Sequence, residues 1–144
     1  MSLDKKSKEN IELVDFLINK DRNFWNALAG KPYYAVFQKV KHFLKSKHYN
    51  YDSFLKKFNE NRLPKEKKIE HTYAHRTIHL ALVDFMRQNK IGFGFKEMKT
   101  INCIEELYFF RWRADYTEDV IRKSDVEDKL RKAKEVIEIV EEMA

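Results

Sequence analysis

The chain has 144 residues, of which 43% are hydrophobic, and we expect a single compact domain spanning residues 1–144. Three glycines and two prolines leave few turns, which argues against a β-sandwich or a β-barrel and favours an all-α domain. Cys103 is the only cysteine, so it cannot form an internal disulfide, and neither a signal-peptide pattern nor a long apolar run occurs. These features predict a cytoplasmic protein without a membrane partner.

The net charge of +6 is unevenly distributed along the chain. Residues 1–100 carry 21 lysines and arginines against 11 aspartates and glutamates, whereas residues 101–144 carry 8 against 12. The domain should therefore have a basic side, which could bind nucleic-acid phosphates or an acidic partner. Charge alone does not separate these possibilities, and lysine-rich helices are also common as solvated surfaces.

In the first half of the chain, apolar spacing predicts a helix over residues 7–20 and a short segment that reaches Leu28. Gly30 should end that segment, and Pro32 suits the first turn of the next helix. The apolar positions of this next helix recur at steps of three and four, and they are Tyr33, Val36, Phe37, Val40 and Leu44. A short helix is expected over residues 52–59, before a lysine-rich connection over residues 62–68.

The second half predicts a long helix over residues 66–89, a turn permitted by Gly92 and Gly94, and another long helix over residues 96–117. Ser124 and Glu127 form a capping-box pattern for the last helix. The apolar seam of that helix consists of Val126, Leu130, Ala133, Ile137 and Val140. We therefore predict an up-and-down bundle of four to five helices, in which a site is built from residues that project inward.

Charged residues interrupt the apolar stripe of the helix predicted over residues 96–117. Arg111 and Asp115 lie one turn apart on the face that carries Leu107, whereas Arg113 points to solvent. Because an unpaired buried charge is costly, the pair is expected to be inward-facing and bound to a partner. One interpretation is a structural ion pair, held through the hydroxyl of Tyr33 or Tyr34.

The second interpretation makes the same pair a binding site. Arg111 would offer its guanidinium to a phosphate, and Asp115 would orient it. Trp112 and Tyr116 could then stack on a base, although aromatic stripes more often form the core. No glycine-rich phosphate loop, Ser-His-Asp pattern or Cys-x-x-Cys motif accompanies them.

Three histidines, His71, His75 and His79, follow one another at intervals of four on the predicted long helix. His71 and His79 would lie about 12 Å apart, too far to bind one ion, so we predict no metal site and no cofactor. A histidine pKa near neutrality suits a general base or a phosphate-binding imidazole. The simplest interpretation is that all three are partly buried and hydrogen-bonded within the bundle.

Three blocks together resemble the HEPN superfamily of small helical prokaryotic proteins. They are residues 31–37 with the pattern Tyr-Tyr-Ala-x-Phe, the histidine-bearing helix, and residues 107–116 with the pattern Arg-x-x-Ala-Asp-Tyr. Lys31 and Pro32 depart from the family, which has a small residue and an arginine there. The resemblance covers most of residues 10–142 and implies a bundle of four or five helices, often dimeric, that is associated with nucleotide or RNA binding.

Many members of that superfamily are metal-independent ribonucleases of toxin-antitoxin or defence systems, and some pair with a nucleotidyltransferase. Their catalytic signature is an arginine followed four to six residues later by a histidine. Arg111 matches the arginine, but Tyr116 and Thr117 stand where the histidine is expected, and no histidine follows His79. The usual catalytic motif is thus incomplete.

We therefore expect a HEPN-like module that binds a nucleotide, RNA or a partner protein and forms a homodimer. The residues predicted to take part in binding are Arg111, Asp115, Tyr116, Tyr33, Tyr34, His71 and His79. One alternative is a ribonuclease in which His75 supplies the missing imidazole beside Arg111. Another is a structural dimerisation domain without a ligand, joined through its last helix or its aromatic residues.

Overall fold

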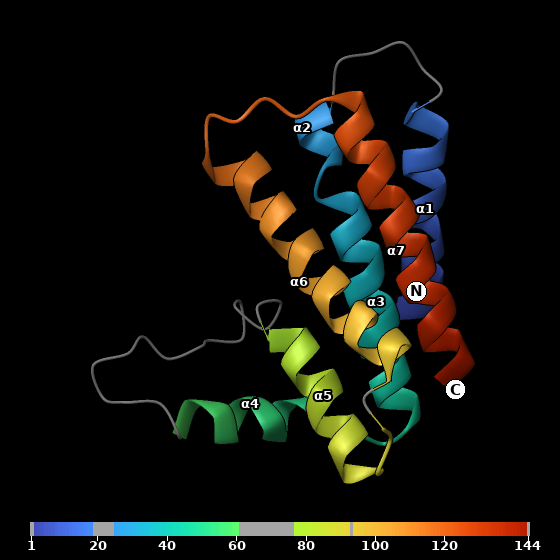
Figure 1. Ribbon diagram of the computed structural model, residues 1–144, viewed down its shortest axis with the longest axis vertical. Helices are drawn as coiled ribbons and strands as arrows, with labels where there is room; N and C mark the ends of the chain where they lie inside the picture. The colour runs from blue at the N-terminus through green and yellow to red at the C-terminus, as the bar shows by residue number, and fades with distance from the viewer. Residues whose placement is uncertain (1, 19–24, 61–76, 93, 144) are drawn as a thin grey trace.

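The computed structural model describes residues 2–18, 25–60, 77–92 and 94–143 of the chain (Figure 1). Seven helices and no strand lie in this part of the chain, which confirms the prediction of an all-α fold. In chain order the helices are α1 Leu3–Ile18, α2 Trp25–Leu28, α3 Lys31–Ser46, α4 Tyr51–Glu60, α5 Ile78–Gln88, α6 Phe95–Tyr116 and α7 Lys123–Met143.

The predicted number of four to five helices is too low because short helices lie between the longer ones. The segment that ends at Leu28 is a separate single turn, α2, and Gly30 and Pro32 then begin α3 as the sequence predicted. Of the long helix predicted over residues 66–89, the structure describes only α5, which starts at Ile78. Residues 61–76 lie outside the described part of the chain.

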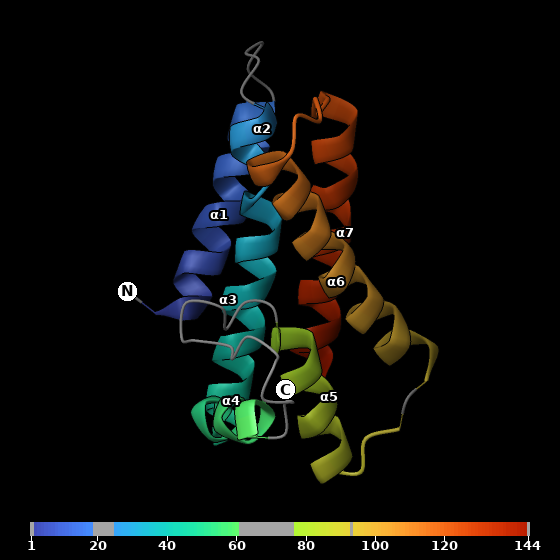
Figure 2. The same ribbon diagram turned by 90° about the vertical axis from the view of Figure 1, so that its left-hand side faces the viewer.

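Helix α3 is the central element of the bundle. It packs against α1, α5, α6 and α7, and Figure 1 shows α1, α3, α6 and α7 extending along the length of the molecule. Helix α4 lies across the end of the molecule at which α3 finishes, as both views show (Figures 1 and 2). The carboxyl-terminal end of α3 and the amino-terminal end of α4 therefore meet at one corner.

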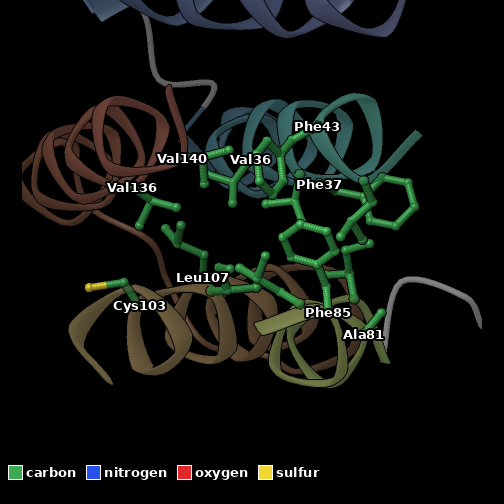
Figure 3. Close-up of a cluster of buried hydrophobic side chains, with 14 of the residues drawn as sticks. Val36, Phe37, Phe43, Ala81, Phe85, Cys103, Leu107, Val136 and Val140 are labelled. Atoms are coloured by element: carbon green, nitrogen blue, oxygen red, sulfur yellow. The ribbon is translucent and has the colours of Figure 1, made fainter. Parts of the chain in front are cut away.

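Two clusters of buried apolar side chains join these helices. In the larger cluster, side chains from α3, α5, α6 and α7 point toward one another (Figure 3). The rings of Phe43 and Phe85 meet edge to face there, with 5.3 Å between their centroids. The smaller cluster gathers Val14, Leu28 and Phe110 where α1, α2, α6 and α7 meet. Burying each such side chain stabilises the fold by roughly 1.5–3 kcal/mol, which is why the apolar spacing located α3 and α7 correctly.

Helix α3 ends with a residue in the left-handed backbone region. His48 has a φ of 59°, and its N–H donates to the carbonyl of Lys45 over 3.0 Å. The N–H of Tyr49 donates to the carbonyl of Leu44 over 2.9 Å. These two bonds form a Schellman motif, in which glycine usually takes the left-handed position.

Helix α5 ends in the same motif, with Lys90 in the left-handed position at a φ of 56°. The N–H of Ile91 donates to the carbonyl of Met86 over 2.9 Å, and Ile91 packs against the larger apolar cluster. The sequence predicted that Gly92 and Gly94 permit this turn, and that prediction is wrong. Neither glycine has a positive φ, because Lys90 makes the turn before the chain reaches them.

The start of α7 also differs from the prediction. The helix begins at Lys123, and the carboxylate of Asp125 accepts a hydrogen bond of 3.0 Å from the N–H of Arg122. Ser124 therefore lies inside the first turn and is not the cap. Asp125 is the third residue of α7, and its side chain bonds back to the N–H of the residue before the helix, as the third residue of a capping box does. This pattern starts two residues earlier than the one predicted from Ser124 and Glu127.

A buried lysine connects three helices. The side chain of Lys39 on α3 is only 11% exposed, and its ammonium lies 2.6 Å from Asp4 on α1 and 3.0 Å from Glu141 on α7. Burial opposes the charged form, but the hydrogen bonds to these two carboxylates prevail and raise the pKa of Lys39. The bond to Lys39 is also the main reason that the pKa of Asp4 is lowered.

Candidate functional site

Arg111 lies in the second half of α6 and packs against the turn that begins α3. Its guanidinium carbon lies 4.9 Å from the ring centroid of Tyr34 and 5.8 Å from that of Tyr33. Gly30 makes this approach possible, because a Cβ there would lie 3.3 Å from Cγ of Arg111 and 3.4 Å from Cε2 of Tyr34. The guanidinium is thus held over the ring faces of the two tyrosines.

The ion pair predicted between Arg111 and Asp115 forms, but it is long. Nε of Arg111 lies 3.6 Å from Oδ2 of Asp115, which exceeds the length of a hydrogen bond. Nε is buried and has no hydrogen-bond partner among the described residues. An unsatisfied charged donor of this kind costs more than the usual 1–3 kcal/mol of a neutral one, so Arg111 is less well satisfied than a charge held in a short ion pair.

The inward orientation predicted for this pair holds for only one of its members. The side chain of Arg111 is 17% exposed, whereas that of Asp115 is 43% exposed and lies at the rim of the site. An i,i+4 pair shares one helix face, but α6 ends one residue later at Tyr116, beyond the cover of the neighbouring helices. The prediction that Asp115 faces inward is therefore wrong.

The two tyrosines predicted as binding residues do lie at this site. Tyr33 is completely buried, and its ring meets that of Tyr108 edge to face at a centroid distance of 5.6 Å. Burial raises the pKa of the Tyr33 hydroxyl far above its ordinary value, although the charge of Arg111 acts in the opposite direction. Tyr33 therefore stays neutral, and Tyr34, which is only partly buried, is the ring that a ligand could reach.

Tyr116 does not join Arg111, although the sequence placed both in one site. It is 67% exposed, and its ring lies 6.0 Å from that of Trp112 on the outer face of α6. Five residues separate Tyr116 from Arg111, which corresponds to about 140° around a helix. The two side chains consequently leave α6 in different directions.

Of the three predicted histidines, the structure describes only His79, and His71 and His75 lie outside the described residues. His79 is half-buried on α5, where burial lowers its pKa and the nearby carboxylate of Glu105 acts in the opposite direction. Glu105 and Arg111 are about 9 Å apart along α6. The structure therefore does not place His79 beside Arg111.

Sequence reasoning missed an exposed apolar stripe on α6, which we call the α6 seam. Its positions follow one another at steps of three and four, and its apolar members are Phe95, Met98, Phe109, Trp112 and Tyr116. Phe109 is 52% exposed and Trp112 is 46% exposed. The spacing was visible in the sequence, but it left open whether the aromatic residues stack on a base, form the core or make an interface, because the inner face of α6 is apolar as well.

Acidic side chains border the carboxyl-terminal half of the α6 seam. Residues 105–119 carry five carboxylates against two arginines. One of the arginines, Arg113, is bound to Asp119 at 3.0 Å, and the other is the buried Arg111. Glu106 is bound by Lys129 and Lys132, so Glu105 and Glu118 are the carboxylates of this stretch that form no ion pair with a described residue.

Comparison with known proteins gives no match: no family model, no curated protein and no solved structure is significantly similar to this chain. Within the described residues, no helix is long and apolar enough to cross a membrane. The same part of the chain holds no group of three or more histidine, cysteine, aspartate or glutamate side chains placed to bind a metal ion.

Proposed function

We propose that the protein is a HEPN-like partner-binding module whose α6 seam binds a basic amphipathic helix of another protein. The observation that carries this proposal is the exposure of Phe109, Trp112 and Tyr116 on one face of α6. Steps of three and four match the spacing at which one helix packs its side chains into another. Soluble proteins seldom expose several large apolar side chains together unless the patch is an interaction site.

The charge around the seam supports the choice of partner. A helix that carries lysines or arginines beside its apolar stripe would complement Glu105 and Glu118, which form no ion pair with a described residue. The resemblance to HEPN proteins supports a setting in a prokaryotic toxin-antitoxin or defence pair, in which a nucleotidyltransferase-type protein is one candidate partner. It also supports a homodimer, which would occupy the seam with a second copy of the chain.

A peptide titration tests the proposal. Two helical peptides about three heptads long share a leucine stripe and differ only in carrying lysine or glutamate on its flanks. The chain contains Trp25 and Trp112 as its only tryptophans, so Trp25→Phe leaves Trp112 as the fluorescent reporter. We expect the lysine-flanked peptide to change the Trp112 emission at micromolar concentration and the glutamate-flanked peptide to bind at least about tenfold more weakly.

Variants in the full chain locate the binding. Phe109→Ser should abolish binding and leave the melting temperature nearly unchanged, since the side chain is half-exposed. Leu13→Ser on α1, at a side chain that is 40% exposed, is the matched control and should bind normally. A chain that binds neither peptide would contradict the proposal. A dimer in ultracentrifugation that dissociates on Phe109→Ser would instead assign the seam to a second copy.

The guanidinium of Arg111, which lies over the ring of Tyr34 and has only a long ion pair to Asp115, favours a second candidate function, in which this residue binds a nucleotide or RNA phosphate. Tyr34 would then be the ring available for stacking. In the ribonuclease form of this hypothesis, Arg111→Lys should reduce both RNA cleavage and growth arrest on expression. Purified protein that cuts no RNA would exclude the ribonuclease and leave binding to be measured separately.

A further inference from the structure

The corner where α3 meets α4 encloses a hollow of about 490 Å³. Its walls come from the last turns of α3, the connecting residues and the start of α4. The residues that line it include Lys41, Lys45, His48, Tyr49, Tyr51 and Asp52. A volume of this size falls within the range of about 300–1,000 Å³ that is typical of small-molecule sites.

The hollow collects positive charge that the protein does not neutralise. Lys41, Lys45 and His48 form no ion pair with any described residue, and Asp52 is the one carboxylate among the residues that line the hollow. Over residues 41–57 the chain carries five lysines and a single acidic residue. This segment belongs to the basic part of the chain that the charge distribution predicted.

Lysines elsewhere in the molecule differ in this respect. On α7, Lys129 and Lys132 both bind Glu106, and Lys134 binds Asp15 at 2.9 Å. Those cations stabilise contacts between helices. Lys41 and Lys45 have no carboxylate partner among the described residues, although the ammonium of Lys41 lies 5.7 Å from the ring centroid of Phe37. Their spacing of four residues places the two side chains on one face of α3, with their Cα atoms about 6 Å apart along its axis.

The backbone fixes the position of His48. His48 holds its left-handed conformation because the Schellman bonds at the end of α3 require it there. The same bonds satisfy the carbonyls of Leu44 and Lys45, so these acceptors do not offset the cations. Tyr49 is fixed as well, since its hydroxyl donates to Asp84 over 2.7 Å and leaves the half-buried ring beside the hollow.

We propose that this hollow binds the phosphate groups of a nucleotide or of a single-stranded nucleic acid, through Lys41, Lys45 and His48. Two lysines without a carboxylate partner among the described residues, with an imidazole and a tyrosine ring beside them, match the combination of phosphate contact and base stacking by which single strands are bound. An acidic peptide would use the cations but not the ring, so the phosphate ligand fits better. The site is separate from the α6 seam and from Arg111.

Fluorescence anisotropy of a labelled oligouridylate RNA, with the full chain, tests the proposal. We expect Lys41→Gln combined with Lys45→Gln to weaken binding at least about tenfold. The slope of log affinity against log salt should fall by about 0.7 for each lost phosphate contact. Asp52→Asn should tighten binding, because it removes the one negative charge that lines the hollow.

Two controls separate this site from the rest of the molecule. Arg122→Gln combined with Lys123→Gln removes the same charge from exposed side chains before and at the start of α7, and it should leave the affinity within about twofold. Arg111→Met in the same assay separates the two sites, because a loss of affinity in Arg111→Met alone would assign RNA binding to Arg111 and overturn the assignment to the hollow. An equal loss in the control pair would overturn the proposal, because binding would then follow net charge alone.

Competition identifies the source of the phosphate. Displacement of the RNA by uridine monophosphate at about millimolar concentration would support a nucleotide as the ligand. Displacement by longer RNA alone would support a nucleic-acid strand. A polyglutamate peptide that displaces the RNA as well as RNA itself does would overturn the phosphate assignment in favour of an acidic peptide, and absence of RNA and nucleotide binding would overturn the site.

Discussion

Lys39 and Arg111 are both cations on the inner side of a helix, but they are satisfied to different degrees. Lys39 meets two carboxylates, Asp4 and Glu141, at distances of 2.6 and 3.0 Å. Arg111 lies over two tyrosine rings, and its one ion pair, to Asp115, has a length of 3.6 Å. A nitrogen of Arg111 remains buried without an acceptor among the described residues.

The difference shows how a structural charge can be told from a charge that is available for binding. Evaluated by burial alone, both residues would count as structural. Evaluated by their acceptors, Lys39 completes a connection between α1, α3 and α7, whereas Arg111 leaves donor capacity unused. Removing the charge of Lys39 should therefore cost more stability than removing that of Arg111. Removing the charge of Arg111 should affect ligand binding more than removing that of Lys39.

Lys39→Met should have the largest effect on stability. It removes both short ion pairs and leaves Asp4 and Glu141 without their shared partner. Because the two carboxylates are partly exposed, the expected loss is about 2 kcal/mol, below the 3–5 kcal/mol of a completely buried pair. Urea denaturation followed by circular dichroism measures it, and Lys8→Met, at an exposed lysine 3.5 Å from the same Asp4, is the matched control.

Arg111→Met should cost less, about 1 kcal/mol. The variant loses the contact between the guanidinium and the tyrosine rings, but it also removes the unsatisfied nitrogen, and methionine keeps much of the packing. The same denaturation experiment measures the change. A loss larger than that of Lys39→Met would show that Arg111 is a structural residue, contrary to the distinction drawn above.

Lowering the pH should weaken the ion pair between Lys39 and Asp4 in the unchanged protein. Since Lys39 lowers the pKa of Asp4 in the folded protein, the stabilisation is present above the ordinary aspartate value of about 3.9 and disappears as the pH falls through the lower folded value. Since the pKa of Lys39 is raised, its share also disappears at strongly alkaline pH, above about 10.5. The stability difference between the wild type and Lys39→Met should thus be constant near neutrality and shrink below pH 4. A difference that persists at pH 2 would contradict this assignment.

The sequence predicted the parts of the molecule that depend on local spacing. The apolar periods located α3, α6 and α7, and the pattern of Gly30 and Pro32 located the start of α3. It failed where a choice depends on tertiary contacts. Lys90 takes the left-handed turn ahead of two glycines because Ile91 packs on the core, and this packing is invisible in a single sequence.

The candidate site shows the same division. Helical spacing paired Arg111 with Asp115 and drew Tyr33 and Tyr34 toward them, and the structure brings Arg111 and both tyrosines together. Spacing could not tell which of the two apolar faces of α6 is covered, so Tyr116 was predicted to share a binding site with Arg111. Only the arrangement of α3, α5 and α7 around α6 decides that question.

Gly30→Ala should have the smallest effect, about 0.5 kcal/mol, and most of it should act through Arg111. The new methyl group would lie 3.3 Å from Cγ of Arg111, closer than ordinary contact, so the arginine stem must shift over the ring of Tyr34. In a background that carries Arg111→Ala the crowding partner is gone, and the cost of Gly30→Ala should fall toward the small cost of alanine at a helix start. A double-mutant cycle by urea denaturation measures this coupling. Equal costs in both backgrounds would show that Gly30 serves the backbone of α3 and does not make room for Arg111.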